Sequence, residues 1–465
     1  MLIILFGVML AVSFSGSVIW TSLGFASVVG IVLFLGPIHF RHYGMIAYVQ
    51  GTSMNQMIAP MFILMAEFLT RGGIAEDIYA VMSRAVGRLK GGLAMATILA
   101  CTIFAALCGS APATAASIGR ISIKEMTDRG YSPAFATGTV AAGGTLGIMI
   151  PPSITLAFFG ILTETSIVRL LMAGILPGVL FAVLMLVYII ISVRLKPEML
   201  NYVEGSASDE MKDASDMDAD TASGIMDSVM AAAKREVKDL PTANVAAVKK
   251  KVTFLTILPA VALIFIVLIS MYAGLATPIE AAGYGVIGSF LICLIQRRLS
   301  GKMFMGAMHE TARNGAMLIF LIMGGFMLTY VISFLGIAMN IAEAIVASGL
   351  NRYVILLALY VVWFILGMLM SPACVILLTI PFMFPSLVLL GFDPIWLGVV
   401  SVIASQLAMI TPPVGLNLFV LKAITGIPIS TIIKGAVPYV LVLLVGLLIL
   451  TIFPSIATIL PNLMF

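Results

Sequence analysis

Long apolar segments separated by short polar stretches recur along almost the whole chain. Runs of about 20 apolar residues are long enough to cross a bilayer as helices. Before a central polar stretch, such segments cover residues 2–19, 22–38, 54–70, 93–108, 110–119, 134–160 and 168–193. After it, they cover residues 252–273, 278–296, 313–334, 353–370, 373–390, 394–423 and 436–460. The pattern predicts an all-α membrane protein that crosses the bilayer many times.

The composition points to the same class. The chain is 61% hydrophobic and only 10% charged, whereas soluble domains carry about 25% charged residues. The net charge of +4 gives no support for nucleic-acid binding, because the basic residues cluster at the ends of apolar segments, where membrane topology explains them. Residues 1–12 lack the basic start and cleavage site of a signal peptide. We therefore expect them to be part of a retained first helix.

The cysteines and histidines do not form a metal-binding pattern. All four cysteines lie inside apolar segments, where free thiols fill space, and the three histidines are not clustered. These residues are Cys101, Cys108, Cys293, Cys374, His39, His42 and His309. We expect free thiols and no site for a transition metal.

Two parts of the chain match at a constant offset. Ser110 and Ser371 each lie within two residues of a proline in a small-residue turn, and 371 − 110 = 261. The same offset separates Pro151-Pro152 from Pro412-Pro413, Gly174 from Gly435, and Pro177 from Pro438. Duplicated units with broken hydrophobic segments at corresponding places indicate the binding site of a secondary transporter.

The apolar segments 93–108 and 110–119 predict a re-entrant hairpin. The turn CGSAPAT between them contains no polar loop, and irregular backbone at membrane depth is tolerated only where it is buried or lines a cavity. Basic residues flank the outer ends of the pair, namely Arg84, Arg88, Lys90, Arg120, Lys124 and Arg129. The positive-inside rule therefore places the open end in the cytoplasm. Counting crossings, the second hairpin, residues 353–390, opens from the outside, so the two repeats are predicted to be inverted.

These features divide the chain into five parts. They are N-terminal scaffold helices (1–75), a first repeat with a cytoplasm-opening hairpin and a broken helix (76–195), a polar cytoplasmic linker (196–251), further scaffold helices (252–334), and a second repeat with a periplasm-opening hairpin, a broken helix and a final helix (335–465). The linker has an acidic first half. It is expected to be a solvated connection, and a regulatory or partner-docking role is the alternative.

The double prolines determine the chemistry expected at the two breaks. Each pair lacks two backbone donors, and each ring disrupts the preceding helical turn. Carbonyl groups are then expected to lack helical partners at Gly147, Met149, Ile150, Ala408, Ile410 and Thr411. Together with the hydroxyls of Ser110 or Ser371, five or six such oxygens would suit sodium. The helix N-termini near Pro112 and Pro372 favour an anion.

Other polar residues have structural interpretations. The run Thr277-Pro278-Ile279-Glu280 predicts a helix start with a capping box. Glu67, inside an apolar segment, is either a functional acid or the partner of a nearby arginine. Glu310 and Arg313 are expected near a helix start, where they pair or extend toward water.

The motifs GSAPATAASIG, GGTLGIMIPPS, LGMLMSP and ITPPVGLNLF, with ATPIEAAGYG at residues 276–285, closely resemble those of the large membrane subunit of tripartite ATP-independent periplasmic (TRAP) transporters. The resemblance covers the chain apart from residues 196–251. It implies a multi-pass protein of the bacterial inner membrane that is not an enzyme. It also implies an elevator mechanism, in which a transport domain of hairpins and broken helices slides against a scaffold.

The same resemblance implies symport of sodium, at two or more sites, with a small organic anion, and no organic cofactor. It implies two protein partners besides membrane lipid: a small four-helix membrane subunit and a soluble periplasmic substrate-binding protein. By motif position, one sodium site involves Cys108, Gly109, Ser110, Gly147, Ile150 and Pro152, and the other involves Gly367, Met370, Ser371, Thr411 and Pro413. The substrate is placed near Ala111, Pro112, Thr114, Ser153, Pro372 and Asn417.

Two departures from the family pattern affect these assignments. Some relatives have an acidic residue at the position of Ser371, and the polar insert here is longer than usual. Two other functions remain as alternatives. One is a stand-alone sodium/dicarboxylate or citrate symporter of related inverted-hairpin architecture. The other is an intramembrane enzyme or scaffold, which is disfavoured because the sequence shows no paired intramembrane aspartates, no Ser/His pair and no metal-binding helix.

Overall fold

The computed structural model describes residues 1–14, 19–200, 230, 253–337, 339–341, 343, 349–412 and 415–464. These residues are mostly helical, and no strand occurs among them. Eight helices are long and apolar enough to cross a membrane, or nine if one bent pair is counted as a single span. The predicted all-helical membrane class is confirmed for the part of the chain that the structure describes.

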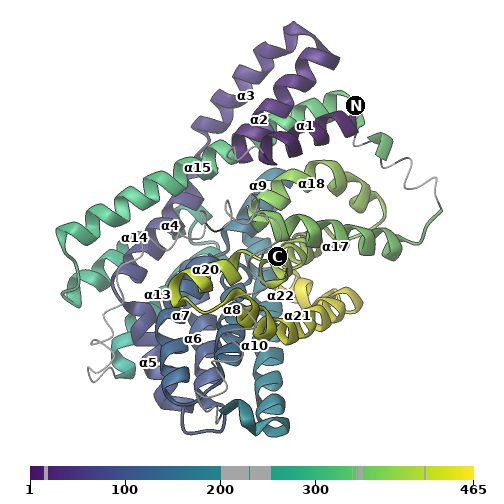
Figure 1. Ribbon diagram of the computed structural model, residues 1–465. Coiled ribbons are helices and arrows are strands. Elements are labelled where there is room, and N and C mark those ends of the chain that lie inside the picture. The colour runs from purple at the N-terminus through teal and green to yellow at the C-terminus, as the bar shows by residue number, and fades with distance from the viewer. Residues whose placement is uncertain are drawn as a thin grey trace.

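One group of helices contains the N-terminal part of each half of the chain. The long helix α15 packs against α2, α3 and α4, and α14 packs against α4 and α13. In Figure 1, α1–α3 lie at the top of the molecule, and α15 runs from them down to its left edge. The helices are α1 (Leu2–Phe14), α2 (Ile19–Gly30), α3 (Phe40–Thr52), α4 (Ile58–Arg71), α5 (Ile74–Val86), α13 (Phe254–Tyr272), α14 (Pro278–Ile295) and α15 (Gly301–Phe334), with short turns η1 (Ile31–Leu35), η2 (Pro37–His39) and η3 (Met54–Met57).

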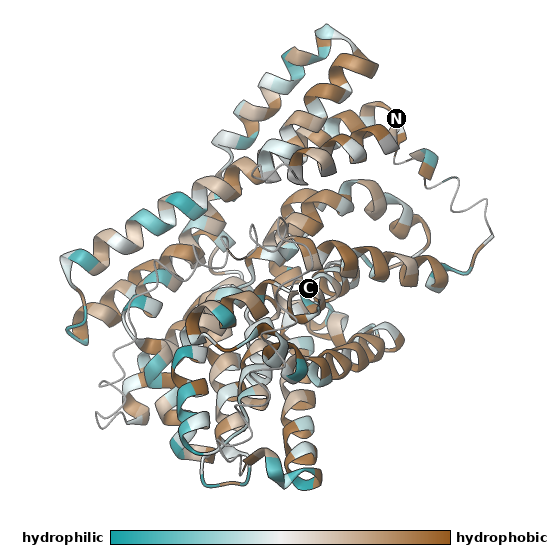
Figure 2. Cartoon of the chain, in the orientation of Figure 1, coloured by the Kyte–Doolittle hydropathy of each residue, from teal (hydrophilic) through white to brown (hydrophobic). Residues whose placement is uncertain are grey.

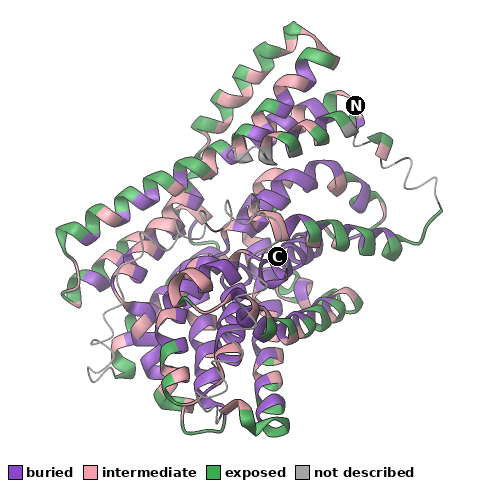
Figure 3. Ribbon diagram, in the orientation of Figure 1, coloured by how far each residue is buried: buried purple, intermediate pink, exposed green. Residues whose placement is uncertain are grey.

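A second group contains the two predicted hairpins and broken helices. Its first half comprises α6 (Gly92–Cys108), α7 (Ala111–Asp128), α8 (Pro133–Met149), α9 (Ile154–Thr163) and α10 (Ile167–Leu195), followed by η4 (Pro197–Leu200). Its second half comprises α17 (Arg352–Leu369), α18 (Pro372–Leu389), α19 (Pro394–Leu407), η7 (Ala408–Ile410), α20 (Leu416–Thr425), α21 (Ile429–Ile452) and α22 (Ser455–Met464). Helix α8 lies in the buried centre, whereas α17 and α21 carry exposed faces (Figure 3).

The constant offset in the sequence extends to the bounds of these helices. Helices α7 and α18 both begin and end 261 positions apart, since 372 − 111 = 261 and 389 − 128 = 261. Helix α8 corresponds in the same way to α19 with η7, since 394 − 133 = 261 and 410 − 149 = 261. Each half therefore contains the same succession of a helical pair, a helix that ends before a double proline, and a helix that follows it.

The two halves exchange contacts symmetrically. Helix α7 packs against α20, and its counterpart α18 packs against α9, the counterpart of α20. Likewise α8 packs against α21, and α19 packs against α10. Close approach of α8 and α21 depends on glycine, because a Cβ atom on Gly435 would lie 1.7 Å from the Ala134 carbonyl oxygen. Small residues allow such backbone contact between membrane helices.

The outer faces of the long helices are apolar. Exposed apolar side chains lie on α10, α13, α17 and α21, and the ribbons of α10, α17 and α21 are mostly brown in Figure 2. Examples are Val183, Val187, Phe265, Val361, Ile365, Leu444 and Leu448. Exposed apolar faces of this kind are unfavourable in water and suit contact with lipid chains.

Several local predictions can be checked. Thr277 caps α14 and forms the expected capping box with Glu280, and Glu67 pairs with Arg71, with 2.7 Å between Oε2 and Nε. Arg313 and Glu310 also pair, at 3.9 Å. Their helix, however, begins at Gly301, so these two residues lie more than two turns inside it. The expectation of a helix start at that place was wrong, because the polar face of α15 continues the helix upstream.

Other predicted segments had different bounds. The apolar segment 436–460 is two helices, with a break at Phe453 and Pro454, because proline interrupts a helix. Helix α5 was not predicted, because its polar residues interrupt the apolar run that marks a membrane-spanning segment. Of the predicted linker, residues 196–200 and 230 are described; the remaining residues of 196–251 lie outside the described part, as does Pro413.

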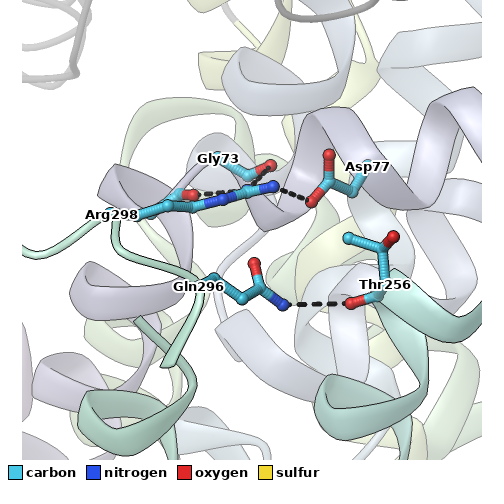
Figure 4. Close-up of polar contacts among 6 residues, drawn as sticks. Gly73, Asp77, Thr256, Gln296 and Arg298 are labelled. Atoms are coloured by element: carbon cyan, nitrogen blue, oxygen red, sulfur yellow. Dashed lines mark hydrogen bonds and ion pairs between the residues drawn. The ribbon is translucent and has the colours of Figure 1, made fainter. Parts of the chain in front are cut away.

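Helices α4 and α5 meet at a bend of 62°. Gly72 and Gly73 form the break, and the Arg298 guanidinium donates to both of their carbonyl oxygens, at 2.7 and 3.0 Å. The same guanidinium pairs with Asp77 in the first turn of α5 (Figure 4). A cation at the carbonyl end of one helix and an anion in the first turn of the next both match the helix dipoles. Arg298, which lies in the connection between α14 and α15, therefore stabilises the bend between α4 and α5.

Candidate ion and substrate site

The tip of the first hairpin is a sharp turn between α6 and α7. Gly109 has a left-handed backbone, with φ +63°, and its N–H donates to the Ala105 carbonyl at 3.1 Å. Ser110 is the N-cap residue of α7, and Pro112 lies in the first turn. Glycine ends α6 here because other residues pay a steric cost in this conformation. The turn predicted between these two apolar segments is thus formed by the expected residues.

This tip lies against the first double-proline break. A Cβ atom on Gly109 would lie 2.6 Å from the Pro152 carbonyl oxygen, and one on Gly147 would lie 2.5 Å from the Ser110 carbonyl oxygen. The Ser110 carbonyl already accepts from Thr114, through N–H at 3.1 Å and Oγ1 at 2.8 Å. The tip and the broken helix therefore pack backbone to backbone, with a carbonyl oxygen against a glycine at each of two places.

Not every residue assigned to this first site faces the tip. Ile150 ends α8, and its Cγ1 atom lies 2.5 Å from the position that a Cβ atom on Gly178 would occupy. The side chain of Ile150 therefore contacts α10. Cys108 is buried at the end of α6, next to the turn. The structure brings Gly109, Ser110, Gly147 and Pro152 together and leaves Ile150 as a backbone contributor at most.

The second hairpin tip is built differently. Met370, with φ −144°, occupies the position that corresponds to Gly109, and Ser371 is the N-cap residue of α18. The Ser371 hydroxyl donates to the Cys374 sulfur at 3.1 Å. Upstream in α17, a Cβ atom on Gly367 would lie 2.5 Å from the Ser405 carbonyl oxygen. Close backbone contact with the second broken helix therefore comes from the hairpin arm.

The end of the second broken helix retains local hydrogen bonds. Thr411 Oγ1 donates to the Leu407 carbonyl at 2.9 Å, and Thr411 N–H donates to the Ala408 carbonyl at 3.1 Å. The expectation that the Ala408 carbonyl lacks a partner was wrong, because a short 3₁₀ turn continues the helix to Ile410. With Pro413 outside the described residues, the second site is only partly assembled here.

The residues assigned to the substrate fall into two places. Ala111, Pro112 and Thr114 begin α7 and are buried, and this helix packs against α8 and α20. The wholly buried Asn417 of α20 donates from Nδ2 to the Ala141 carbonyl of α8, at 3.4 Å. This first group therefore shares one side of α8.

The remaining two lie across the other helix pair. Ser153 caps α9, accepting from the Leu156 N–H at 3.3 Å, and Pro372 begins α18, which packs against α9. The assigned substrate residues are thus distributed over both symmetric helix pairs. In this structure the Ser153 hydroxyl caps the N-terminus of α9.

Sequence reasoning missed Gln406. This residue of α19 is 2% exposed, and its Nε2 donates to the carbonyl oxygen of Thr145 in α8. Its Oε1 is buried and has no hydrogen-bond partner among the described residues, and the same holds for Oδ1 of Asn417. A glutamine inside an otherwise apolar run could have identified the position. In addition, the part of the chain that the structure describes contains no group of three or more His, Cys, Asp or Glu able to hold a metal ion.

Comparison with known proteins gives a consistent result. A family model described as the DctM component of the tripartite ATP-independent periplasmic transporter matches residues 6–456. The C4-dicarboxylate TRAP transporter large permease protein DctM of Pseudomonas aeruginosa is 33% identical over 95% of this chain and 94% of its own length. The isethionate TRAP transporter permease protein DctMQ of Oleidesulfovibrio alaskensis is 29% identical over 97% of this chain and 65% of its own length.

The fold also resembles that of a solved transporter. The crystal structure of the YdaH transporter of Alcanivorax borkumensis superposes with a TM-score of 0.60 at 16% sequence identity, covering 92% of this chain and 89% of that one. At this identity the likeness concerns the fold alone. The overall fold is therefore one that a protein of distant sequence also adopts.

Proposed function

Because the chain belongs to the DctM component family of tripartite ATP-independent periplasmic transporters, we propose that it is the large membrane subunit of a sodium-coupled importer of a small organic anion. The anion, a carboxylate or sulfonate, is delivered by a soluble periplasmic binding protein. A small four-helix membrane subunit completes the transporter in the bacterial inner membrane. The substrates named for the two relatives, C4-dicarboxylate and isethionate, are anions of these two kinds.

One observation carries the sodium proposal. The Pro152 carbonyl oxygen lies against Gly109, and the Ser110 carbonyl oxygen lies against Gly147, each so closely that an added Cβ atom would be within 2.6 Å of it. Neutral oxygens from unwound backbone are the ligands that transporters use for sodium. Ser110 supplies a hydroxyl at the same turn, so the donor set fits a small hard cation, and Gly367, Ser371 and Thr411 form the corresponding part of a second site.

The anion proposal rests on the helix starts. Helices α7 and α18 begin at the two hairpin tips, with Pro112 and Pro372 in their first turns. Each N-terminus has free backbone N–H groups and the positive end of a helix dipole. An anion between the tips would therefore lie near both N-termini and near the bound sodium ions, and its charge would be offset by both.

The symmetric exchange of contacts supports an inverted repeat and an elevator mechanism. If α7 packs against α20 as α18 packs against α9, the hairpins and broken helices form one body that can move as a unit. The helices α1–α4 and α13–α15 then serve as the scaffold. In this scheme, the bend between α4 and α5 connects the two bodies.

Uptake into proteoliposomes tests the coupling. The chain is reconstituted with its small subunit, and its binding protein is first matched to a ligand by thermal shift against a panel of organic acids. Uptake of that ligand is expected only with an inward sodium gradient. Equal uptake with a potassium gradient would refute sodium coupling. A stand-alone symporter, the alternative, would keep its uptake after deletion of the binding-protein gene, whereas the tripartite transporter would lose it.

A further inference from the structure

A continuous series of contacts connects the two hairpins through one pair of residues, Thr145 and Gln406. The tip of the first hairpin contacts α8 at Gly147, where the Ser110 carbonyl approaches. Two residues earlier on α8, the Thr145 carbonyl accepts from Gln406 of α19. One residue before Gln406, the Ser405 carbonyl lies against Gly367 of the second hairpin. Each predicted cation site is thus within a few residues of the Thr145–Gln406 hydrogen bond.

The position of this hydrogen bond in the repeat is special. Thr145 and Gln406 are 261 positions apart in the chain, which is the offset that relates the two halves. Equivalent positions of two symmetric units can touch only close to the axis that relates the units. The bond therefore joins the two broken helices at their centre. Asn417 donates to the carbonyl of Ala141, one turn before Thr145, and adds a second link on the same face of α8.

Burying the amide of Gln406 costs free energy that a purely apolar side chain would not cost at this position. Its side chain is 2% exposed, and its Oε1 has no partner among the residues described. A buried acceptor without a partner costs free energy that a leucine of similar size would not. Packing alone does not account for the amide. Among the described residues, the one hydrogen bond of its side-chain amide is to the opposite repeat.

We infer that Gln406 is a positioning residue that couples the two cation sites. Binding at the first site fixes α8 against the tip of the first hairpin. Through Thr145 and Gln406, this also fixes α19 against the second hairpin, so that the second ion binds to a site already in place. The inference rests on the proposed sodium coupling and adds a specific consequence: the two ions bind cooperatively, and Gln406 carries the cooperativity. The coupling needs no contact between Gln406 and either ion.

A sodium titration of the full chain in nanodiscs tests this inference. The signal is intrinsic tryptophan fluorescence, because Trp363 in α17 and Trp396 in α19 are both buried in the second half. Sodium chloride replaces choline chloride at constant ionic strength. Because two coupled sites allow a Hill coefficient of up to two, we expect about two for the natural chain and about one for Gln406→Leu. A transmitted packing change alone would alter the thermal midpoint and leave the Hill coefficient unchanged.

The chain offers a matched control. Gln296 likewise donates from Nε2 to a backbone carbonyl, that of Thr256, at 3.1 Å, and its Oε1 is also buried without a partner in the described structure. It lies at the end of α14, in the other helix group (Figure 4). Gln296→Leu is expected to keep the natural Hill coefficient. If Gln406→Leu does not fold, Gln406→Asn keeps the amide and is too short to reach Thr145, and it should give the same loss.

The outcomes are distinguishable. A Hill coefficient near two that persists in Gln406→Leu and Gln406→Asn would overturn the coupling role and leave the proposed function intact. Equal loss of cooperativity in Gln296→Leu would also overturn it, because the effect would then be general. If the natural chain responds to sodium no differently than to potassium, the proposed function itself fails, and this inference fails with it.

Discussion

Gly109 and Pro152 meet backbone to backbone: a Cβ atom on Gly109 would lie 2.6 Å from the Pro152 carbonyl oxygen. The two residues belong to the first hairpin tip and the first double-proline break, which are separate features in the sequence. Their contact means that the shape of the tip determines where the oxygens of the break lie.

Gly109→Ala is expected to displace the first hairpin tip. The new methyl group meets a carbonyl oxygen, and φ of +63° adds a strain of roughly 1–2 kcal/mol for any L-residue. Since 1.4 kcal/mol is tenfold in a binding constant, sodium affinity should fall about tenfold or more. Sodium-dependent uptake in proteoliposomes measures the change.

The matched control is Gly274→Ala. Gly274 has φ +68°, and no atom lies within 4 Å of its Cβ position, so the backbone strain is the same and the contact is missing. This variant should lose stability of roughly 1–2 kcal/mol and keep its sodium affinity. Equal sodium affinities for the two variants would show that the contact with Pro152 is unimportant.

Gly435→Ala is expected to separate α8 from α21. Its Cβ atom would lie 1.7 Å from the Ala134 carbonyl oxygen, and rigid backbone on both sides cannot yield. Overpacking of this kind costs about 1–3 kcal/mol, so the thermal midpoint of the purified protein should fall. Gly283→Ala, in α14 with nothing within 4 Å, should raise the midpoint slightly, because alanine is the better helix former. A Gly435→Ala midpoint at or above that of the natural chain would contradict the packing described.

Arg298→Met should destabilise the bend between α4 and α5. It leaves the Asp77 carboxylate, whose side chain is 7% exposed, without its cation, and it removes two hydrogen bonds to the break. Loss of one partner from a buried pair costs 3–5 kcal/mol, and because the Arg298 side chain is 29% exposed, we expect about 2 kcal/mol. Thermal unfolding of the purified protein measures this loss of stability.

A double-mutant cycle with Asp77→Asn separates the ion pair from the hydrogen bonds. The double variant should be less destabilised than the sum of the two single variants, because either single change already removes the ion pair. Strict additivity would mean that Arg298 acts only through the carbonyls of Gly72 and Gly73.

The repeat and the breaks could be read from the sequence because proline and glycine act locally. The double proline Pro151-Pro152 ends α8 wherever the helix packs, and the capping box at Thr277 depends only on its neighbours in the chain. These predictions needed no tertiary information. The paired Glu67 and Arg71 were accessible for the same reason, since helix geometry places residues four apart on one face.

Contacts between the halves could not be read in this way. Gln406 meets Thr145 only because the two broken helices face each other. The hydropathy pattern does not reveal which helices of the two halves lie next to each other. The 3₁₀ turn that satisfies the Ala408 carbonyl is a similar case, because it depends on how α19 ends against α17. Met370, at the position of Gly109, shows that equivalent positions in a repeat need not share a backbone conformation.

The central claim is that two hairpins enter from opposite sides and end inside the protein. Single cysteines in a chain freed of its four natural ones test it most directly, with a membrane-impermeant maleimide applied to either side. Leu89 and Leu389, both exposed at the hairpin bases, should label from the cytoplasm and from the periplasm, respectively. Ala111 at the first tip and Ala373 at the second should label from neither side in sodium. Free labelling of both tips from bulk water, or labelling of both bases from one side, would contradict the account.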